Sequence, residues 1–168
     1  MLHTALLLLL APPAVVGDLK TNFDEEMKKV IALAEAIPED KYSYRPAANV
    51  RSTGEVLVHI ANGNREFLTA MKGATRDDMM KLFQQQEKLE KTLTAKAAII
   101  AEVKASWAEV TKALDAENEQ SLKKPVPTFG PKATVQAVWI ETVSHAAEHL
   151  GQLIAYARAG GIKPPWSN

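Results

Sequence analysis

Two histidines stand four residues apart in ETVSHAAEHLGQL, residues 141–153. Residues at this spacing share a helix face, with Cβ atoms about 5–6 Å apart, so His145 and His149 can both reach one metal ion. Two imidazoles hold a metal poorly, and surface pairs at this spacing are common. A third histidine, His59, lies between Val58 and Ile60, where a buried imidazole needs a partner. If their two helices are neighbours, the three side chains predict an open three-nitrogen site for a divalent metal.

Three glutamates lie within one helical turn of these histidines: Glu55, Glu141 and Glu148. Such a carboxylate can accept the second ring N–H of a metal-binding imidazole. We expect Glu55 to cap its helix instead, and Glu148 to face solvent. The alternative to a metal is a structural role, with the histidines hydrogen-bonded to helix carbonyls or to Glu141. The zinc-protease pattern His-Glu-x-x-His is absent and Ser144 lacks a nucleophile elbow, so neither a metalloprotease nor a serine hydrolase is supported.

Four amphipathic segments must position these groups. Apolar residues recur at helical spacing in residues 18–37, 52–72, 94–117 and 134–159. Ser52 and Glu55 form a capping box at the start of the second segment, and Gly160 and Gly161 end the fourth. The polar segment 73–94 predicts either a short helix or a mobile connection. Since no stretch alternates like a strand, the sequence predicts an all-α fold, an antiparallel four-helix bundle.

Composition narrows the possible functions. The 168 residues suffice for one domain with a single core. Twenty Lys and Arg balance twenty Asp and Glu, and without a basic cluster this balance argues against a nucleic-acid partner. The chain has no cysteine, so any metal must be held by His, Asp or Glu.

The first seventeen residues, MLHTALLLLLAPPAVVG, contain no charged side chain. Their apolar run is shorter than the roughly 20 residues of a membrane span, and no other segment could cross a bilayer. The run predicts a secretory signal peptide cut near Asp18, although no Lys or Arg precedes it. A disordered or mis-started N-terminus is the alternative. A signal peptide implies a secreted or periplasmic protein with a mature domain of residues 18–168, and the alternative implies a cytoplasmic one.

Three features occur in a characteristic order: IPEDKYSYRPAANVRSTGEVLVHIAN (residues 37–62), the HxxxH pair, and GQLIAYARAGGIKPP (residues 151–165). With these features the chain resembles the DinB-like superfamily of metal-dependent four-helix-bundle proteins, which is distinct from the like-named polymerase. The resemblance spans about residues 18–165. It implies an up-down-down-up bundle in which His59, His145 and His149 bind a divalent metal, commonly zinc or nickel.

Members of this superfamily are often homodimers, and some are transferases or isomerases that use a thiol such as bacillithiol or mycothiol. The resemblance therefore implies a metal-dependent transferase, such as a thiol S-transferase, or a hydrolase acting on a small-molecule substrate. Many members have no assigned activity, so the alternative is a non-catalytic, stress-related binding or scaffold bundle with a structural metal. Two features fit thiol chemistry poorly. Relatives often carry an acid where this chain has Asn62, and an exported protein would not meet a cytosolic thiol.

Overall fold

The computed structural model describes residues 13–167, and four long helices dominate it: α1 (Ala14–Ala36), α2 (Thr53–Met71), α4 (Lys96–Leu114) and α6 (Val135–Ala159). The connections contain the remaining helices: η1 (Glu39–Lys41), α3 (Arg76–Thr92), α5 (Glu119–Leu122) and η2 (Pro127–Phe129). Within the described residues, β structure is confined to an isolated bridge between Pro125 and Thr134. The predicted all-α fold is confirmed.

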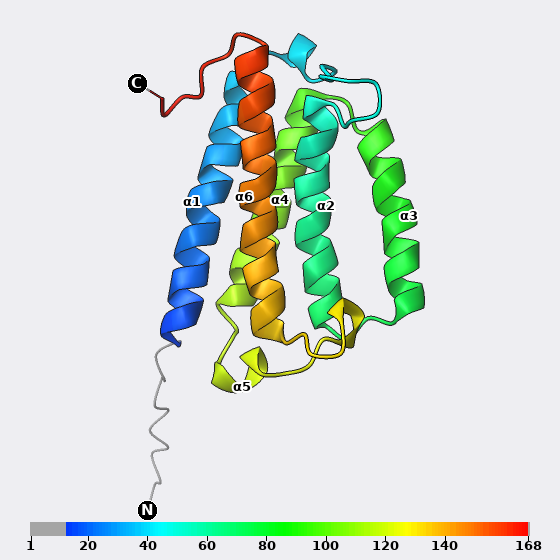
Figure 1. Cartoon of the computed structure of the whole chain (residues 1–168), viewed down its shortest axis with the longest axis vertical. Coiled ribbons are helices and arrows are strands. Elements are labelled where there is room, and N and C mark those ends of the chain that lie inside the picture. Colours follow the sequence, from blue (N-terminus) through cyan, green and yellow to red (C-terminus); the bar gives the residue numbers. More distant parts are fainter. Residues whose placement is uncertain (1–12, 168) are drawn as a thin grey trace, which may run out of the picture.

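The four long helices follow an up-down-down-up course. In the view of Figure 1, α1 and α6 run upward, whereas α2 and α4 run downward. Both α1 and α2 pack against α4 and α6, so the ring of neighbours contains two antiparallel and two parallel pairs. This arrangement places α2 beside α6, which is the condition that the three-histidine site required.

One hydrophobic core fills the bundle, and each long helix contributes to it. Among its largest fully buried side chains are Phe23 and Met27 of α1, Leu57 of α2, Ile99 of α4 and Trp139 of α6. These side chains lie on the apolar stripes that helical spacing predicts. Burying one such side chain contributes about 1.5–3 kcal/mol, so the core fixes the helices that carry the histidines.

The two histidine-bearing helices have well-defined ends. At the start of α2, Ser52 Oγ accepts the backbone N–H of Glu55 at 3.2 Å, and the Glu55 carboxylate accepts the N–H of Ser52 at 2.9 Å. This is the predicted capping box. At the same end of the bundle, α6 closes at Gly160, and Gly161 takes a left-handed conformation with φ 77°, as a helix-terminating glycine does.

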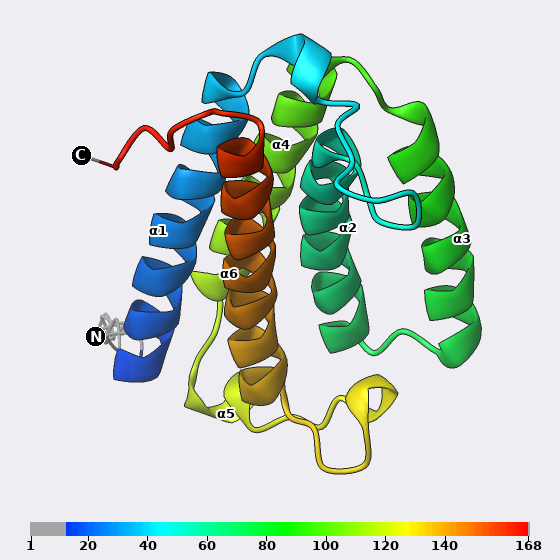
Figure 2. The same ribbon diagram turned by 45° about the horizontal axis from the view of Figure 1, so that its top comes forward.

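Helix α3 is a full helix of 17 residues, which settles a segment that the sequence left open between a short helix and a mobile connection. Thr75 and Asp78 form a capping box at its start. Figures 1 and 2 both show α3 alongside α2, outside the four-helix bundle. Only Met79 and Gln86 of this helix are buried, so few apolar side chains are needed on it and its sequence shows a weak helical periodicity.

Two reciprocal hydrogen bonds join α2 to α3. Asn62 Nδ2 donates to the carbonyl of Gln86 at 3.2 Å, and Gln86 Nε2 donates to the carbonyl of Asn62 at 2.9 Å. Both side chains are buried, where an unpaired amide would be costly. Asn62 therefore holds α2 and α3 together.

The predicted leader lies mostly outside the described residues. Helix α1 begins at Ala14, and Val16 is buried in the core, so the predicted boundary near Asp18 falls inside a helix. Across residues 13–167, no helix is both long and apolar enough to cross a bilayer.

Candidate metal centre

Three imidazoles converge where α2 and α6 pack together. His59 projects from α2, and His145 and His149 project from α6, one turn apart. One ring nitrogen of each lies within 4.8 Å of the other two, and the Nε2 atoms of His59 and His145 are 3.3 Å apart. The structure thus brings together the three residues that the sequence proposed as metal ligands. Metal binding itself stays a prediction.

The close approach of α2 and α6 depends on Gly63. A Cβ atom added to this residue would lie 2.3 Å from Cε1 of His145 and 2.9 Å from its Nδ1. Those distances are far inside van der Waals contact, so any larger residue would displace the ring. Gly63 stands one turn after His59 on α2, and the space left by its missing side chain is filled by the imidazole of His145.

Helix α3 supplies the partner of His59. The Nδ1 atom of His59 lies 2.9 Å from Oε1 of Glu90, whose Oε2 accepts a hydrogen bond from Arg51 Nε at 2.8 Å. Burial raises the pKa of Glu90, but the bonds from His59 and Arg51 outweigh it and lower that pKa to about 2. Ionised at neutral pH, Glu90 keeps the His59 proton on Nδ1, which leaves the Nε2 lone pair facing the cluster.

The second anchored ring belongs to α6 itself. His149 Nδ1 lies 2.8 Å from the side-chain oxygen of Gln152, and Gln152 Nε2 donates in turn to the hydroxyl of Tyr156 at 2.9 Å. The three side chains form a chain along one face of the helix. As for His59, the bond from Nδ1 leaves Nε2 as the nitrogen with a free lone pair.

The cluster favours neutral imidazoles. Burial, together with the neighbouring His149 and His59, lowers the pKa of His145 to about 3, and burial also lowers the pKa of His149. Neutral imidazole is the form that binds metals. Nδ1 of His145 is buried without a hydrogen-bond partner within residues 13–167, so this ring has a polar atom whose hydrogen bond is not satisfied by the protein. The donor set therefore fits a divalent ion.

The glutamates expected near the site have other roles. Glu55 caps α2 and pairs with Arg45, and Glu141 and Glu148 are exposed, as was expected for Glu148. The suggestion that Glu141 bonds a ring is wrong, since the ring bonds of the described residues lead elsewhere. The acceptor is Glu90, 31 positions beyond His59, and no local spacing could identify it.

Comparison with known proteins identifies the family of this chain. The profile of the DinB family matches residues 16–168. The chain belongs to the DinB family. Among its relatives is the uncharacterized protein YjoA of Bacillus subtilis (strain 168), which is 29% identical over 132 residues, 77% of this chain and 80% of YjoA.

Two solved structures share the fold of this DinB-family protein. The crystal structure of the DinB-like protein YjoA from Bacillus subtilis superposes with a TM-score of 0.66 at 23% identity, covering 87% of this chain and 93% of that one. An uncharacterised protein from Escherichia coli UTI89 gives a TM-score of 0.68 at 18% identity, covering 90% and 98%. At these identities the likeness concerns the fold, and it confirms the helical bundle.

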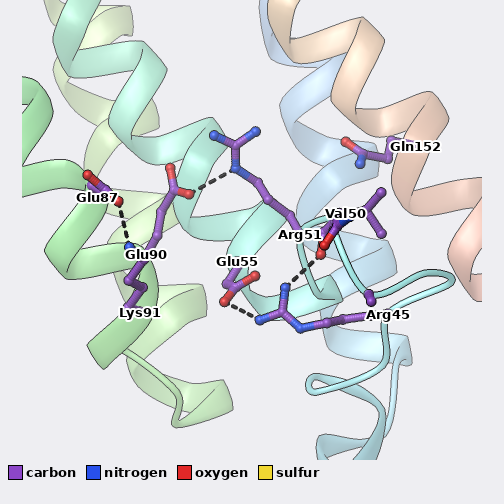
Figure 3. Close-up of a pocket in the computed structure, with 10 residues that line it drawn as sticks. Arg45, Val50, Arg51, Glu55, Glu87, Glu90, Lys91 and Gln152 are labelled. Atoms are coloured by element: carbon purple, nitrogen blue, oxygen red, sulfur yellow. Dashed lines mark hydrogen bonds and ion pairs between the residues drawn. The ribbon is translucent and has the colours of Figure 1, made fainter.

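Beside the histidine cluster, this DinB-family protein has a polar pocket of roughly 980 Å³. Its charged lining residues are Arg45, Arg51, Glu55, Glu87, Glu90 and Lys91. Glu90 and Gln152 belong both to the pocket lining and to the hydrogen bonds of the histidines. Figure 3 shows the guanidinium of Arg51 directed at Glu90, and that of Arg45 directed at Glu55. The pocket therefore presents both signs of charge next to the cluster.

Proposed function

We propose that this protein is a metal-dependent enzyme, a transferase or a hydrolase of a small molecule, in which His59, His145 and His149 hold one divalent ion. The observation that carries the proposal is the convergence of three imidazole nitrogens within 4.8 Å. Three protein ligands leave a coordination position open, which is the pattern of catalytic rather than structural sites. Zinc or nickel is the expected ion, because imidazole nitrogen suits both.

The chain's own residues prepare the centre for such an ion. When bound, a divalent ion acts as a Lewis acid that favours deprotonation of a water or a thiol. Glu90 and Gln152 fix the tautomers of His59 and His149, which leaves the Nε2 lone pair of each ring free to bind the ion. The absence of a side chain at Gly63 makes room for the imidazole of His145.

The volume and the charged lining of the polar pocket favour a small, charged substrate. Its volume of roughly 980 Å³ lies within the usual range of ligand pockets, about 300–1,000 Å³. Arg51 donates its Nε to Glu90, and no other hydrogen bond of Arg51 occurs in the described part of the chain. Its terminal N–H groups are therefore available to an anionic group of the substrate.

A non-catalytic role is the second candidate: a stress-related binding or scaffold bundle whose metal only stabilises the fold. One observation favours it. The carboxylates nearest the cluster are already engaged, Glu90 by His59 and Arg51, and Glu55 by Arg45, whereas a general base needs a free acceptor. Under this alternative, chelation lowers the melting temperature and no small molecule competes for the open coordination position.

Metal content of the purified chain tests the site. We expect one divalent ion per chain by elemental analysis, and loss of that ion when His59, His145 or His149 is replaced by alanine. Glu141→Ala, which removes an exposed side chain one turn before His145 on α6, is the matched control and should retain the metal. Full stoichiometric metal in all three cluster variants would contradict the proposal. A small molecule that displaces a metal-bound water would favour the enzyme over the scaffold.

We infer further that residues 1–17 direct export and that the chain forms a homodimer. The charge-free apolar leader supports export, and the family resemblance supports the dimer. Mass spectrometry of the mature N-terminus and light scattering of the purified protein test the two inferences. A cut after Gly17 would remove buried Val16 from α1, so we expect such a cut to lower thermal stability.

A further inference from the structure

A second pocket, distinct from the polar one, lies at the opposite end of α2 and α3. Its volume is roughly 690 Å³. Its walls come from the end of α2, the following turn, the start of α3 and η2: Glu66, Ala70, Gly73, Ala74, Thr75, Arg76, Met79, Met80, Phe83, Pro127, Thr128 and Phe129. Most of these side chains are apolar, so the pocket suits a ligand with an apolar body.

Two of the apolar side chains that line this pocket are exposed to solvent rather than buried in the core of the bundle. Met80 is 50% exposed and Phe83 is 40% exposed, and they are two of the four large hydrophobic side chains exposed among the described residues. Both belong to α3 and line this pocket. Methionine and aromatic side chains adapt well to apolar ligands.

Glu66 gives the pocket its polarity. Its carboxylate is half-buried, and no hydrogen bond or ion pair to it occurs within residues 13–167. Burial raises the pKa of Glu66, against a smaller opposing effect of His59. A half-buried carboxylate without a partner is stabilised in its ionised form by a cation brought next to it.

The other charged residue of the lining does not cancel this preference. Arg76 is exposed in the first turn of α3, where water and salt screen its charge. Two acidic neighbours, Asp77 and Asp78, occupy the same turn. The charge felt inside the pocket is therefore that of Glu66.

We propose that this pocket binds a small primary amine with an apolar chain, whose ammonium group pairs with Glu66. The chain of the ligand lies against Met80, Phe83 and Phe129. The site needs no metal, so it stands apart from the function proposed above.

Three ligands with the same chain and different head groups test the proposal on the full-length protein freed of metal with EDTA. n-Hexylamine, n-hexanol and n-hexanoate are titrated at neutral pH by calorimetry. We expect the amine to bind roughly tenfold or more tightly than the alcohol, as a charge-assisted contact implies, and the carboxylate to bind most weakly. From butylamine to hexylamine, affinity should rise about fourfold per methylene.

Substitution of Glu66 supplies the matched comparison. Glu66→Gln should abolish the preference for the amine over the alcohol, whereas Glu25→Gln, an exposed glutamate on α1, should leave it unchanged. Backbone NMR shifts should locate the amine at residues 66–83 and 127–129. Equal affinity for all three head groups, preference for hexanoate, shifts elsewhere, or no binding at all would each overturn the proposal. If Glu66→Gln fails to fold, the head-group series on the unaltered chain decides the matter.

Discussion

Replacing Glu90 by glutamine separates the charge of this side chain from its shape. In the native structure the carboxylate holds His59 Nδ1 at 2.9 Å and accepts Arg51 Nε at 2.8 Å. A glutamine amide has one acceptor oxygen and no negative charge, so its bond to the imidazole is weaker. His59 then loses the partner that fixes its tautomer and makes Nε2 a stronger ligand.

We expect the affinity for zinc to fall between 10- and 100-fold, which is the usual cost of removing such a partner and equals about 1.4–2.8 kcal/mol. The contact with His59 should account for most of it. The His59 and Glu90 side chains are 21% and 13% exposed, whereas Arg51 is 42% exposed, so water weakens the Arg51 ion pair.

A competition titration of metal-free protein with a chelating dye measures this affinity, and circular dichroism checks the helical content. Glu87→Gln is the matched control, since Glu87 lies nearby on α3, is 69% exposed and pairs with Lys91. It should leave zinc affinity unchanged. If Glu90→Gln binds zinc as tightly as the native chain, with α3 still protected from hydrogen exchange, then Glu90 does not orient His59 and the reasoning fails.

Three further predictions concern the packing and protonation of the site. Gly63→Ala should displace His145, abolish metal binding and destabilise the fold by about 1–3 kcal/mol; Gly151→Ala, at an open position of α6, should instead stabilise by about 0.5–1 kcal/mol. Denaturant unfolding measures both, and a neutral Gly63→Ala would refute the close approach. Asn62→Asp removes the amide that donates to Gln86, so it should destabilise by about 1–3 kcal/mol and speed hydrogen exchange in α3; unchanged exchange would show that this bond does not hold the helix. In metal-free protein, stability should fall as the pH drops from 6.5 toward about 3, because burial lowers the pKa of His145 and the unfolded chain takes up the proton first. Glu90, whose pKa is lowered from 4.5 to about 2, acts in the same direction between about pH 4.5 and 2. Between pH 6.5 and 4.5, where Glu90 stays ionised, urea unfolding would show no slope if the His145 and His149 rings were not desolvated.

The helices that form the bundle could be predicted because their information is local. Apolar residues three and four apart, the Ser52 and Glu55 capping box and the glycines after Ala159 act within a few turns of chain. Segment 73–94 could not be decided in the same way. Its helix packs on one neighbour and buries two side chains, which leaves too little apolar periodicity to distinguish a helix from a polar connection.

The three histidines were identifiable from the sequence because each occupies an inward position of a strongly periodic helix, and their residue type alone limits their chemistry to hydrogen bonding, proton transfer or metal binding. Their convergence required the packing of α2 against α6, which helical spacing cannot supply. The same packing gives Gly63 its role, since a glycine in a helix is explained only by what approaches it.

By itself, the sequence determined which residues could bind a metal and which helices carry them, because both depend on residue type and short-range spacing. The tertiary structure decided which groups hold those residues in place. Glu90 reaches His59 across 31 positions on a helix held to α2 by Asn62 and Gln86, and contacts between distant segments depend on how whole helices pack rather than on any pattern within one of them.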